Sequence, residues 1–353
     1  MLENAGRQSE ASSDGAVSGL FQMARGEVGA ALLVSAVTKL KVFEHLRHGP
    51  IGFERMRRHL GIEERPLIVL LLTLQAMGTL RIRNDWLIRL TGISKSYLLP
   101  SSRLYLGEYL KLLASSACVR EVTQRLRSNQ PRTWRNLGPV FSYRDGFPSP
   151  MEVPTEARRL TVALSGLALA LAPIVARRVE LRSNKVVLDV GGGTGFYALA
   201  LLKRNPQMRA IILDRPEVLK VTSRFVRKHG LQGRVELCPA DMFTHRLPST
   251  IDTILLSNVL HDWDVPACER LLRRCSESLP KAGKLIIHDE FIQSASQIKL
   301  STALHSAHLF LSTKGRLYMV REVTNWLRST GLRPAKKLIP TDFGYSVLTA
   351  TKH

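Results

Sequence analysis

A glycine-rich turn directly after a short apolar run most constrains the fold of this chain. Residues 186–190 read Val-Val-Leu-Asp-Val, and four of the next five residues are glycine. Glycines between a strand and a helix let the backbone turn sharply and let a ligand approach with no Cβ in the way. We therefore expect a ligand-binding turn, followed by a helix from about Phe196 whose N-terminus favours a negative group.

This pattern of an apolar run followed by a helix repeats to the end of the chain. From Lys185 onward, short apolar runs alternate with amphipathic helical stretches, which predicts a mostly parallel sheet with helices on both faces. Residues 181–353 are thus expected to form a Rossmann-like α/β domain. The expected strands are Val186–Val190, Ala210–Leu213, Val235–Cys238, Thr253–Leu256, Leu285–Ile287 and Tyr345–Thr351.

The first half of the chain predicts a different, mainly helical structure. Residues 1–18 read as a loose tail, and residues 19–105 as helices over 30–46, 53–60 and 67–77 followed by a hairpin over 80–90. Three helices and a hairpin outline a winged helix. Residues 106–180 are expected to be a helical linker that helps to form a substrate pocket, interrupted by an irregular stretch from Asn129 to Pro154. That stretch holds Trp134, Phe141, Tyr143 and Phe147.

Charge, cysteine content and hydropathy limit the partners and the cellular compartment that we expect for this chain. Lys and Arg total 51 against 29 acidic residues, a net charge of +22, but the basic residues are scattered and favour a solvated surface over a specific nucleic-acid site. None of the four cysteines forms a Cys-x-x-Cys pair, which suits a reducing, cytoplasmic setting. The longest apolar stretch, Val162–Ala176, contains Pro173 and is too short to cross a membrane, so we expect a buried helix there.

Three acids at successive strand ends discriminate between cofactors. Residues 193–198 also satisfy a dinucleotide fingerprint, so a nicotinamide-dependent oxidoreductase is an alternative. Asp189, inside the first strand, would lie badly against a pyrophosphate but suits the ammonium group of a methionine moiety. Asp214 can accept two ribose hydroxyls, and Asp241, flanked by Met242 and Phe243, suits an adenine. Together they favour S-adenosylmethionine (SAM).

A histidine at the end of the fourth strand supplies a candidate base. Residues 257–261 read Ser-Asn-Val-Leu-His, and chemistry in open α/β sheets gathers outside the carboxyl ends of the strands. Methyl transfer from a sulfonium requires the acceptor hydroxyl to lose its proton, which an imidazole can take near neutral pH. His261 is therefore a candidate general base that needs no metal ion, and a hydrogen-bonded structural histidine is the alternative.

Four motifs together resemble a known enzyme family. Residues 187–195 (Val-Leu-Asp-Val-Gly-Gly-Gly-Thr-Gly), 213–218 (Leu-Asp-Arg-Pro-Glu-Val), 240–243 (Ala-Asp-Met-Phe) and 258–264 (Asn-Val-Leu-His-Asp-Trp-Asp) are similar to plant caffeate and bacterial small-molecule O-methyltransferases. This family includes acetylserotonin and hydroxyneurosporene methyltransferases. The resemblance runs from about residue 20 to the end and implies a homodimer formed through the winged-helix domain.

The resemblance also implies roles for individual residues. Gly191 and Gly193 would line the SAM loop, Asp214 would hold the ribose, and Asp241 with Met242 the adenine. His261 would be the base for methylation of a hydroxyl on a small apolar or aromatic acceptor, leaving S-adenosylhomocysteine (SAH).

The chain departs from the family pattern in its carboxylates. The first expected acid aligns with Asp289, with Glu290 as a near alternative, and Asp is one methylene shorter than the usual Glu. Leu317 stands where the second acid is expected, and Ser257 replaces a lysine. A more acidic phenol or enol as acceptor, C-methylation and loss of catalysis therefore stay open. His305 and His308 are expected to be pocket or core histidines.

Overall fold

The computed structural model describes residues 19–133, 149–181 and 185–353, and divides the chain into two units. The first unit joins the N-terminal residues up to 132 with residues 292–319, and the second joins residues 133–291 with 320–353. The aromatic residues Trp134, Phe141, Tyr143 and Phe147, singled out in the sequence, lie outside the described residues.

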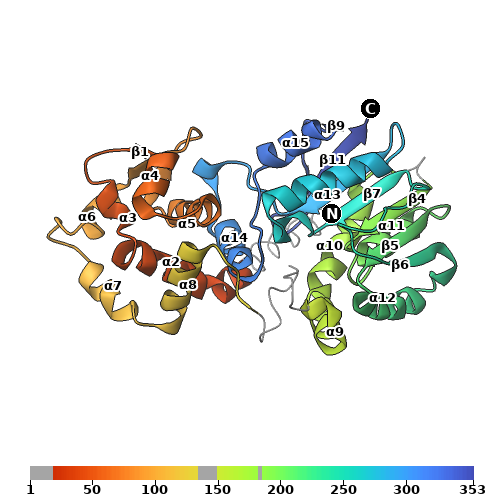
Figure 1. The fold of residues 1–353 in the computed structure, drawn as a ribbon, viewed down its shortest axis with the longest axis horizontal. Helices are drawn as coiled ribbons and strands as arrows, with labels where there is room; N and C mark the ends of the chain where they lie inside the picture. Colours follow the sequence, from red (N-terminus) through yellow and green to blue (C-terminus); the bar gives the residue numbers. More distant parts are fainter. Residues whose placement is uncertain (1–18, 134–148, 182–184) are drawn as a thin grey trace, which may run out of the picture. The chain divides into compact units, whose positions relative to one another are not determined.

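The first unit is mainly helical and is built around one largely buried helix. Ten residues of α5, Pro66–Gln75, are buried, and α14 and α2 pack against this helix (Figure 1). Its helices are α2 (Gly26–Thr38), α3 (Val42–His45), α4 (Phe53–Leu60), α5 (Glu64–Ala76), α6 (Gly92–Tyr97), α7 (Gly107–Leu113), α8 (Ala117–Ser128) and α14 (Leu300–Ser312).

The predicted hairpin is present and completes a small three-stranded sheet. Strand β2 (Leu80–Ile82) pairs antiparallel with β3 (Leu87–Leu90), and β1 (Ile51–Gly52) pairs with the other edge of β3. Two helices differ from the sequence prediction. The helix expected over 30–46 breaks at Lys41, whose φ of 52° is left-handed. Helix α5 begins at Glu64, before the proline that we expected to open it, because a proline in the first helical turn displaces no helical hydrogen bond.

One arginine fastens the two sequence segments of this unit together. The Arg65 guanidinium donates to the main-chain oxygens of Phe310 (2.8 Å), Thr313 (2.6 Å) and Gly315 (2.9 Å), at the end of α14. It also donates to Asn129 Oδ1 (3.0 Å) and lies 4.7 Å from the centre of the Phe310 ring. Residues 310–315 are thereby held on the N-terminal helices.

The second unit contains the mostly parallel sheet that the sequence predicts, whereas residues 292–319, expected within the same domain, group with the first unit. The strand order is β10-β11-β8-β7-β4-β5-β6, with β9 on β11; β4 to β8 run parallel and β11 is antiparallel to β8. The strands are β4 (Val186–Val190), β5 (Arg209–Asp214), β6 (Val235–Pro239), β7 (Thr253–Ser257), β8 (Lys284–Asp289), β9 (Leu332–Pro334), β10 (Ile339–Pro340) and β11 (Ser346–Lys352).

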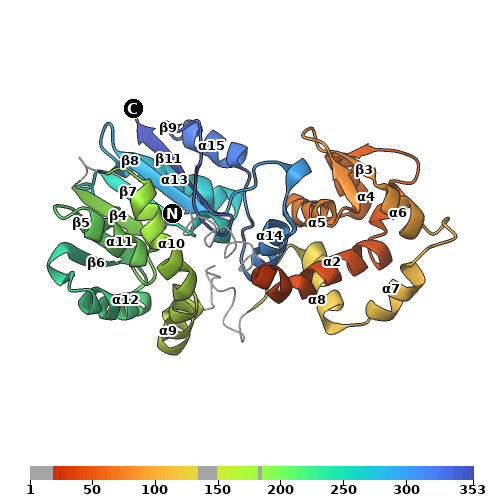
Figure 2. The same ribbon diagram turned by 180° about the vertical axis from the view of Figure 1, so that it is seen from behind.

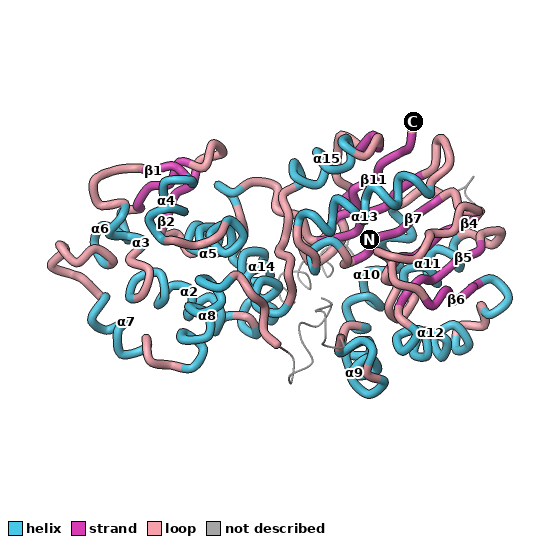
Figure 3. The backbone as a smooth tube through the Cα atoms, in the orientation of Figure 1, coloured by secondary structure: helices cyan, strands magenta, loops and turns pink. Residues whose placement is uncertain are grey.

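Helices cover both faces of this sheet. Helices α10 and α11 lie on one face and α13 on the other (Figures 1 and 2), and Figure 3 shows the helix–strand alternation along the chain. The chain leaves β4 for β5 and β6, then returns to β7 on the other side of β4, so the topological switch point lies beside the β4 end. The helices are α9 (Pro154–Ala163), α10 (Ser165–Arg178), α11 (Phe196–Arg204), α12 (Pro216–Lys228), α13 (Val265–Ser278) and α15 (Val320–Ser329).

The apolar stretch at 162–176 is not the single buried helix that we predict from the sequence. Helices α9 and α10 meet at a 51° bend, and Val162, Leu164 and Leu169 are about half exposed. Among the described residues, no single helix has the length and hydropathy of a membrane span, although α9 and α10 taken together would pass that test.

Candidate active site

The glycine turn after β4 adopts a conformation that only glycine takes easily. Gly191, Gly193 and Gly195 have φ values of 68°, 56° and 78°. A Cβ at Gly192 would come within 2.6 Å of Ile212, whereas one at Gly193 would meet no atom of the described part of the chain within 4 Å. The turn is therefore packed against β5 on one side and open at Gly193, as a ligand cradle requires.

Asp189 is buried beneath this turn with one carboxylate oxygen unused. The residue is 1% exposed, and the main-chain N–H of Ala198, in the first turn of α11, donates to its carboxylate. Among the described residues, Oδ2 has no hydrogen-bond partner. Burial raises the pKa of Asp189 to about 7, with a further rise from the charge of Asp214. A buried carboxylate of this kind is stabilised by a cationic group.

Asp214 ties the glycine turn to the end of β5. Its Oδ2 accepts from the Gly193 N–H (2.8 Å) and its Oδ1 from the Arg215 N–H (2.7 Å). Desolvation raises the pKa of this carboxyl to about 6, although these two hydrogen bonds oppose the rise. Each oxygen keeps a lone pair, so the carboxylate can still accept from two hydroxyl groups.

Asp241 lies at the next strand end, where the chain leaves β6. Its Oδ1 accepts from the Phe243 N–H (2.7 Å), and its Oδ2 contacts Arg215 Nη1 at 3.3 Å. The Phe243 ring packs edge-on against Trp263, with ring centres 4.6 Å apart, and the Met242 carbonyl accepts from Arg274 Nε (2.9 Å). Asp241, Met242 and Phe243 thus form one fixed edge, as adenine binding requires.

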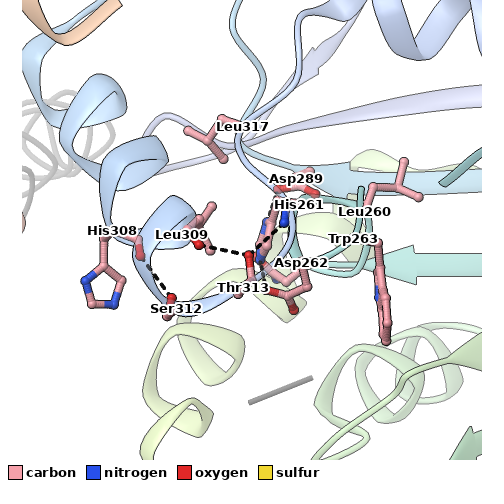
Figure 4. A network of polar contacts seen from close by, with 12 residues as sticks. Leu260, His261, Asp262, Trp263, Asp289, His308, Leu309, Ser312, Thr313 and Leu317 are labelled. Carbon is pink, nitrogen blue, oxygen red and sulfur yellow. Dashed lines mark hydrogen bonds and ion pairs between the residues drawn. The ribbon is translucent and has the colours of Figure 1, made fainter. Parts of the chain in front are cut away.

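His261 is held by the predicted carboxylate. Beyond β7 the chain turns through Asn258, whose φ is 56°, into a 3-10 turn that carries the histidine, which is 7% exposed. Its Nδ1 lies 2.6 Å from Asp289 Oδ1 (Figure 4). Asp289 itself, rather than the alternative Glu290, makes this contact.

A second carboxylate lies on the other side of the imidazole. Asp262 Oδ1 is 3.8 Å from His261 Nε2, and the Asp262 side chain is buried. Burial alone would lower the pKa of His261, but the charges of Asp289, then Asp262, outweigh it and raise the pKa to about 9. Burial raises the pKa of Asp262 to about 7. The imidazole is therefore poised to hold a proton as imidazolium.

Sequence reasoning did not single out Asp262, Trp263 or Arg215. Asp262 and Arg215 directly follow predicted site residues and Trp263 lies two positions after one, so closeness in the chain was the available signal. The position at which the second family acid is expected lies in the first unit. Leu317 is fully buried, and its N–H donates to Ser306 Oγ (3.3 Å).

The two helical histidines expected in the pocket or core differ from each other. On α14, His305 is buried, as expected. His308 is exposed, and its carbonyl accepts from the Ser312 hydroxyl (Figure 4). Among the described residues, no group of three His, Cys, Asp or Glu side chains could hold a metal ion.

The site fits the SAM molecule that the sequence predicts. Asp189 offers an unused buried oxygen to an ammonium group, Asp214 offers acceptors to ribose hydroxyls, and the turn at Gly193 leaves room for the ligand between them. A pyrophosphate would place its negative charge against Asp189, which opposes the dinucleotide alternative.

Comparisons with known proteins agree with this geometry. Residues 151–333 match the model of the O-methyltransferase domain. A crystal structure of an O-methyltransferase family 2 protein from Planctomyces limnophilus, in complex with apigenin, superposes with a TM-score of 0.85 at 35% identity over 96% of both chains.

Two further relatives are more distant. The 3-hydroxy-5-methyl-1-naphthoate 3-O-methyltransferase of Streptomyces sahachiroi is 29% identical over 84% of each chain. Human N-acetylserotonin methyltransferase in complex with SAM shares the fold, with a TM-score of 0.58 at 20% identity over 99% of this chain and 97% of the other.

Proposed function

The chain belongs to the O-methyltransferase family and uses SAM as its methyl donor, and on that premise we propose that His261 is the general base for methylation of an aromatic hydroxyl. The observation that carries this proposal is the buried contact between His261 Nδ1 and Asp289 Oδ1 at 2.6 Å. In the neutral imidazole, a carboxylate on Nδ1–H fixes the tautomer whose Nε2 lone pair can take a proton.

The residues of this chain then divide the chemical work. When bound, SAM would supply an electrophilic methyl group and become the neutral thioether SAH. As the acceptor oxygen forms its bond to carbon, Nε2 of His261 takes the hydroxyl proton, and Nδ1–H continues to donate to Asp289. The resulting imidazolium lies between the carboxylates of Asp289 and Asp262, which stabilise its charge.

The cofactor roles follow the site geometry. Asp189 binds the ammonium group through its unused oxygen, and Gly191 and Gly193 let the methionine moiety approach the backbone. Asp214 accepts from the ribose hydroxyls. Asp241, Met242 and Phe243 would hold the adenine, with the Asp241 carboxylate accepting from its amino group.

The acceptor that fits best is a phenol or enol on a small aromatic ring system. Two of the relatives above carry aromatic molecules in their names, a naphthoate and apigenin. Leu317 in place of a second family carboxylate also favours an acceptor that loses its proton readily, because less stabilisation of the imidazolium is then needed. We infer an acidic phenol rather than an aliphatic alcohol.

Transfer of a tritiated methyl group from SAM to hydroxyflavones and hydroxynaphthoates tests this function. His261→Ala should bind SAH with the affinity of the unsubstituted protein, measured by calorimetry, but lose methyl transfer by about 10²-fold or more. His59→Ala, on an exposed position of α4, is the matched control and should keep full activity. Equal turnover of the His261 variant would remove this residue from the mechanism, and a product methylated on carbon would overturn O-methylation.

We also propose that the chain forms a homodimer through an apolar surface on α6, α7 and the segment between them. Seven large apolar side chains within residues 93–113 are exposed, and such an accumulation is typical of an interaction surface. Its members are Ile93, Tyr97, Leu104, Leu106, Tyr109, Leu112 and Leu113, each 39–74% exposed. A cytoplasmic location is supported by four free cysteines, two of them buried.

A further inference from the structure

Arg215 occupies a position that local rules assign to other residues. It is the N-cap of α12, where Ser, Thr, Asp and Asn are favoured because their side chains accept from the first helical N–H groups. No side chain of the described residues caps this helix, and a cation at a helix N-terminus is opposed by the helix dipole. Such local disagreements in a folded protein concentrate at functional positions.

The backbone conformation of Arg215 is restricted by the next residue in the chain, independently of its side-chain contacts. Pro216 follows at the first helical position, and a residue before proline is confined to extended conformations. Arg215 accordingly has φ −64° and ψ 148°. Its main-chain N–H donates to Asp214 Oδ1 at 2.7 Å, so the same residue meets the carboxylate proposed for the ribose.

The guanidinium joins two carboxylates that come from distant parts of the second unit. Nη1 contacts Asp241 Oδ2 at 3.3 Å, and Nη2 donates to Glu152 Oε1. The three side chains are partly buried, with 24%, 18% and 32% of their surfaces exposed. A planar guanidinium presents its donors in fixed directions, so it can orient a carboxylate where an ammonium group would only neutralise it.

Both carboxylates also accept a hydrogen bond from a main-chain N–H group. The second oxygen of Glu152 accepts from the Ser149 N–H at 3.2 Å within a capping box, and Oδ1 of Asp241 accepts from the Phe243 N–H at 2.7 Å. With one oxygen held by backbone and the other by Arg215, the Asp241 carboxylate has little freedom to rotate. Its remaining lone pairs therefore point in set directions.

We propose that Arg215 is a positioning residue that fixes Asp241 for selective recognition of the 6-amino group of the adenine. This inference rests on the proposed cofactor site. A fixed carboxylate accepts a hydrogen bond from adenine but repels the carbonyl oxygen that replaces the amino group in hypoxanthine. A site that hydrogen-bonds one group rejects an analogue that leaves its buried polar atoms unpaired.

Loss of Arg215 therefore has a signature that general damage does not have. In Arg215→Leu the Asp241 carboxylate can rotate away, so binding of the adenine ligand weakens more than binding of its hypoxanthine analogue. Damage to the fold of the pocket would weaken both ligands by the same factor. The ratio of the two affinities, rather than either affinity alone, reports the positioning role.

Calorimetric titration of the full chain with SAH and with S-inosylhomocysteine measures this ratio. The unsubstituted protein should prefer SAH by about 10-fold or more, as expected for a hydrogen bond to a charged group. Arg215→Leu should reduce the preference to about 3-fold or less, and Arg215→Lys and Glu152→Gln should give intermediate ratios. Arg159→Leu is the matched control, because Arg159 pairs with Glu156 on α9 and should leave the ratio unchanged.

Three outcomes of these titrations distinguish the role of Arg215 from the proposed cofactor site. An unchanged preference in Arg215→Leu, with Arg215→Lys and Glu152→Gln also unchanged, would overturn the role of Arg215 and leave the cofactor site intact. If the unsubstituted protein binds neither ligand, the proposed cofactor site itself is wrong. If Arg215→Leu does not fold, the ratios in Arg215→Lys and Glu152→Gln decide the question.

Discussion

Replacing Asp289 with Asn should change the pH dependence of methyl transfer more than its rate at neutral pH. Asp289 is the first among the groups that raise the pKa of His261, from the usual 6.5 to about 9. That rise corresponds to about 3 kcal/mol of stabilisation of the imidazolium. At pH 7 about one molecule in a hundred then holds His261 as the neutral base, so kcat/KM should rise about tenfold per pH unit up to about pH 9.

In Asp289→Asn the carboxylate charge is lost while the size of the side chain is kept. Burial then lowers the pKa of His261 with less opposition, so a larger fraction is neutral at pH 7. The imidazolium that forms during transfer loses its main partner, so the plateau at high pH should fall by about 10²-fold. At pH 7 the larger neutral fraction and the weaker stabilisation of the imidazolium change kcat/KM in opposite directions. Above pH 9 His261 is neutral in both proteins, so only the weaker stabilisation lowers kcat/KM.

The assay is kcat/KM against a hydroxyflavone from pH 6 to pH 10, at saturating SAM. Asp289→Glu, which keeps the charge, is the matched control and should retain an acid limb well above 6.5. A wild-type acid limb near 6.5, or the same fold loss in Asp289→Asn at every pH, would refute the proposed electrostatic role of Asp289.

Three further outcomes are expected. Asp189→Asn should stabilise the ligand-free protein above pH 7 by at most about 4 kcal/mol, because the raised pKa of about 7 reflects the cost of burying the carboxylate charge. The same substitution should weaken SAH binding, and an unchanged SAH affinity would contradict the role of Asp189. SAH affinity should fall as the pH drops through 7 to 6, where Asp189 and then Asp214 take up protons, and calorimetry across this range checks it. Leu112→Asp should shift the protein from dimer to monomer in sedimentation, and a monomeric unsubstituted chain would contradict the dimer proposal.

Sequence patterns predicted the elements whose local signals agree with the final fold. Strand β4 lies over 186–190 as predicted, and the glycines behind it have the positive φ values that the sharp turn requires. The hairpin around Asn84 follows from alternation of apolar residues over a polar turn. Strand β9, Leu332–Pro334, was not predicted, because three residues at a sheet edge carry too little periodicity to identify.

Contacts between distant segments are what the sequence could not supply. The resemblance placed Asp289 at the position of the family acid expected beside His261, and the structure brings the two side chains into contact. The pairing of Arg215 with Glu152 joins residues 63 positions apart and follows no motif. Arg215 in a helix start reads from the sequence as an exposed charge. Its role depends on which strand ends lie side by side, and only the topology of the sheet decides that.

The course of the chain through the first unit has a consequence for its biosynthesis. Helix α5 is among the first elements to leave the ribosome, yet α14, which packs against it and ends on Arg65, is encoded far downstream. Residues 77–299 must be translated in between, which takes on the order of ten seconds. During that time the apolar residues of α5 that contact α14 lack this partner, so a nascent chain stalled before residue 300 should be an early client of ribosome-associated chaperones.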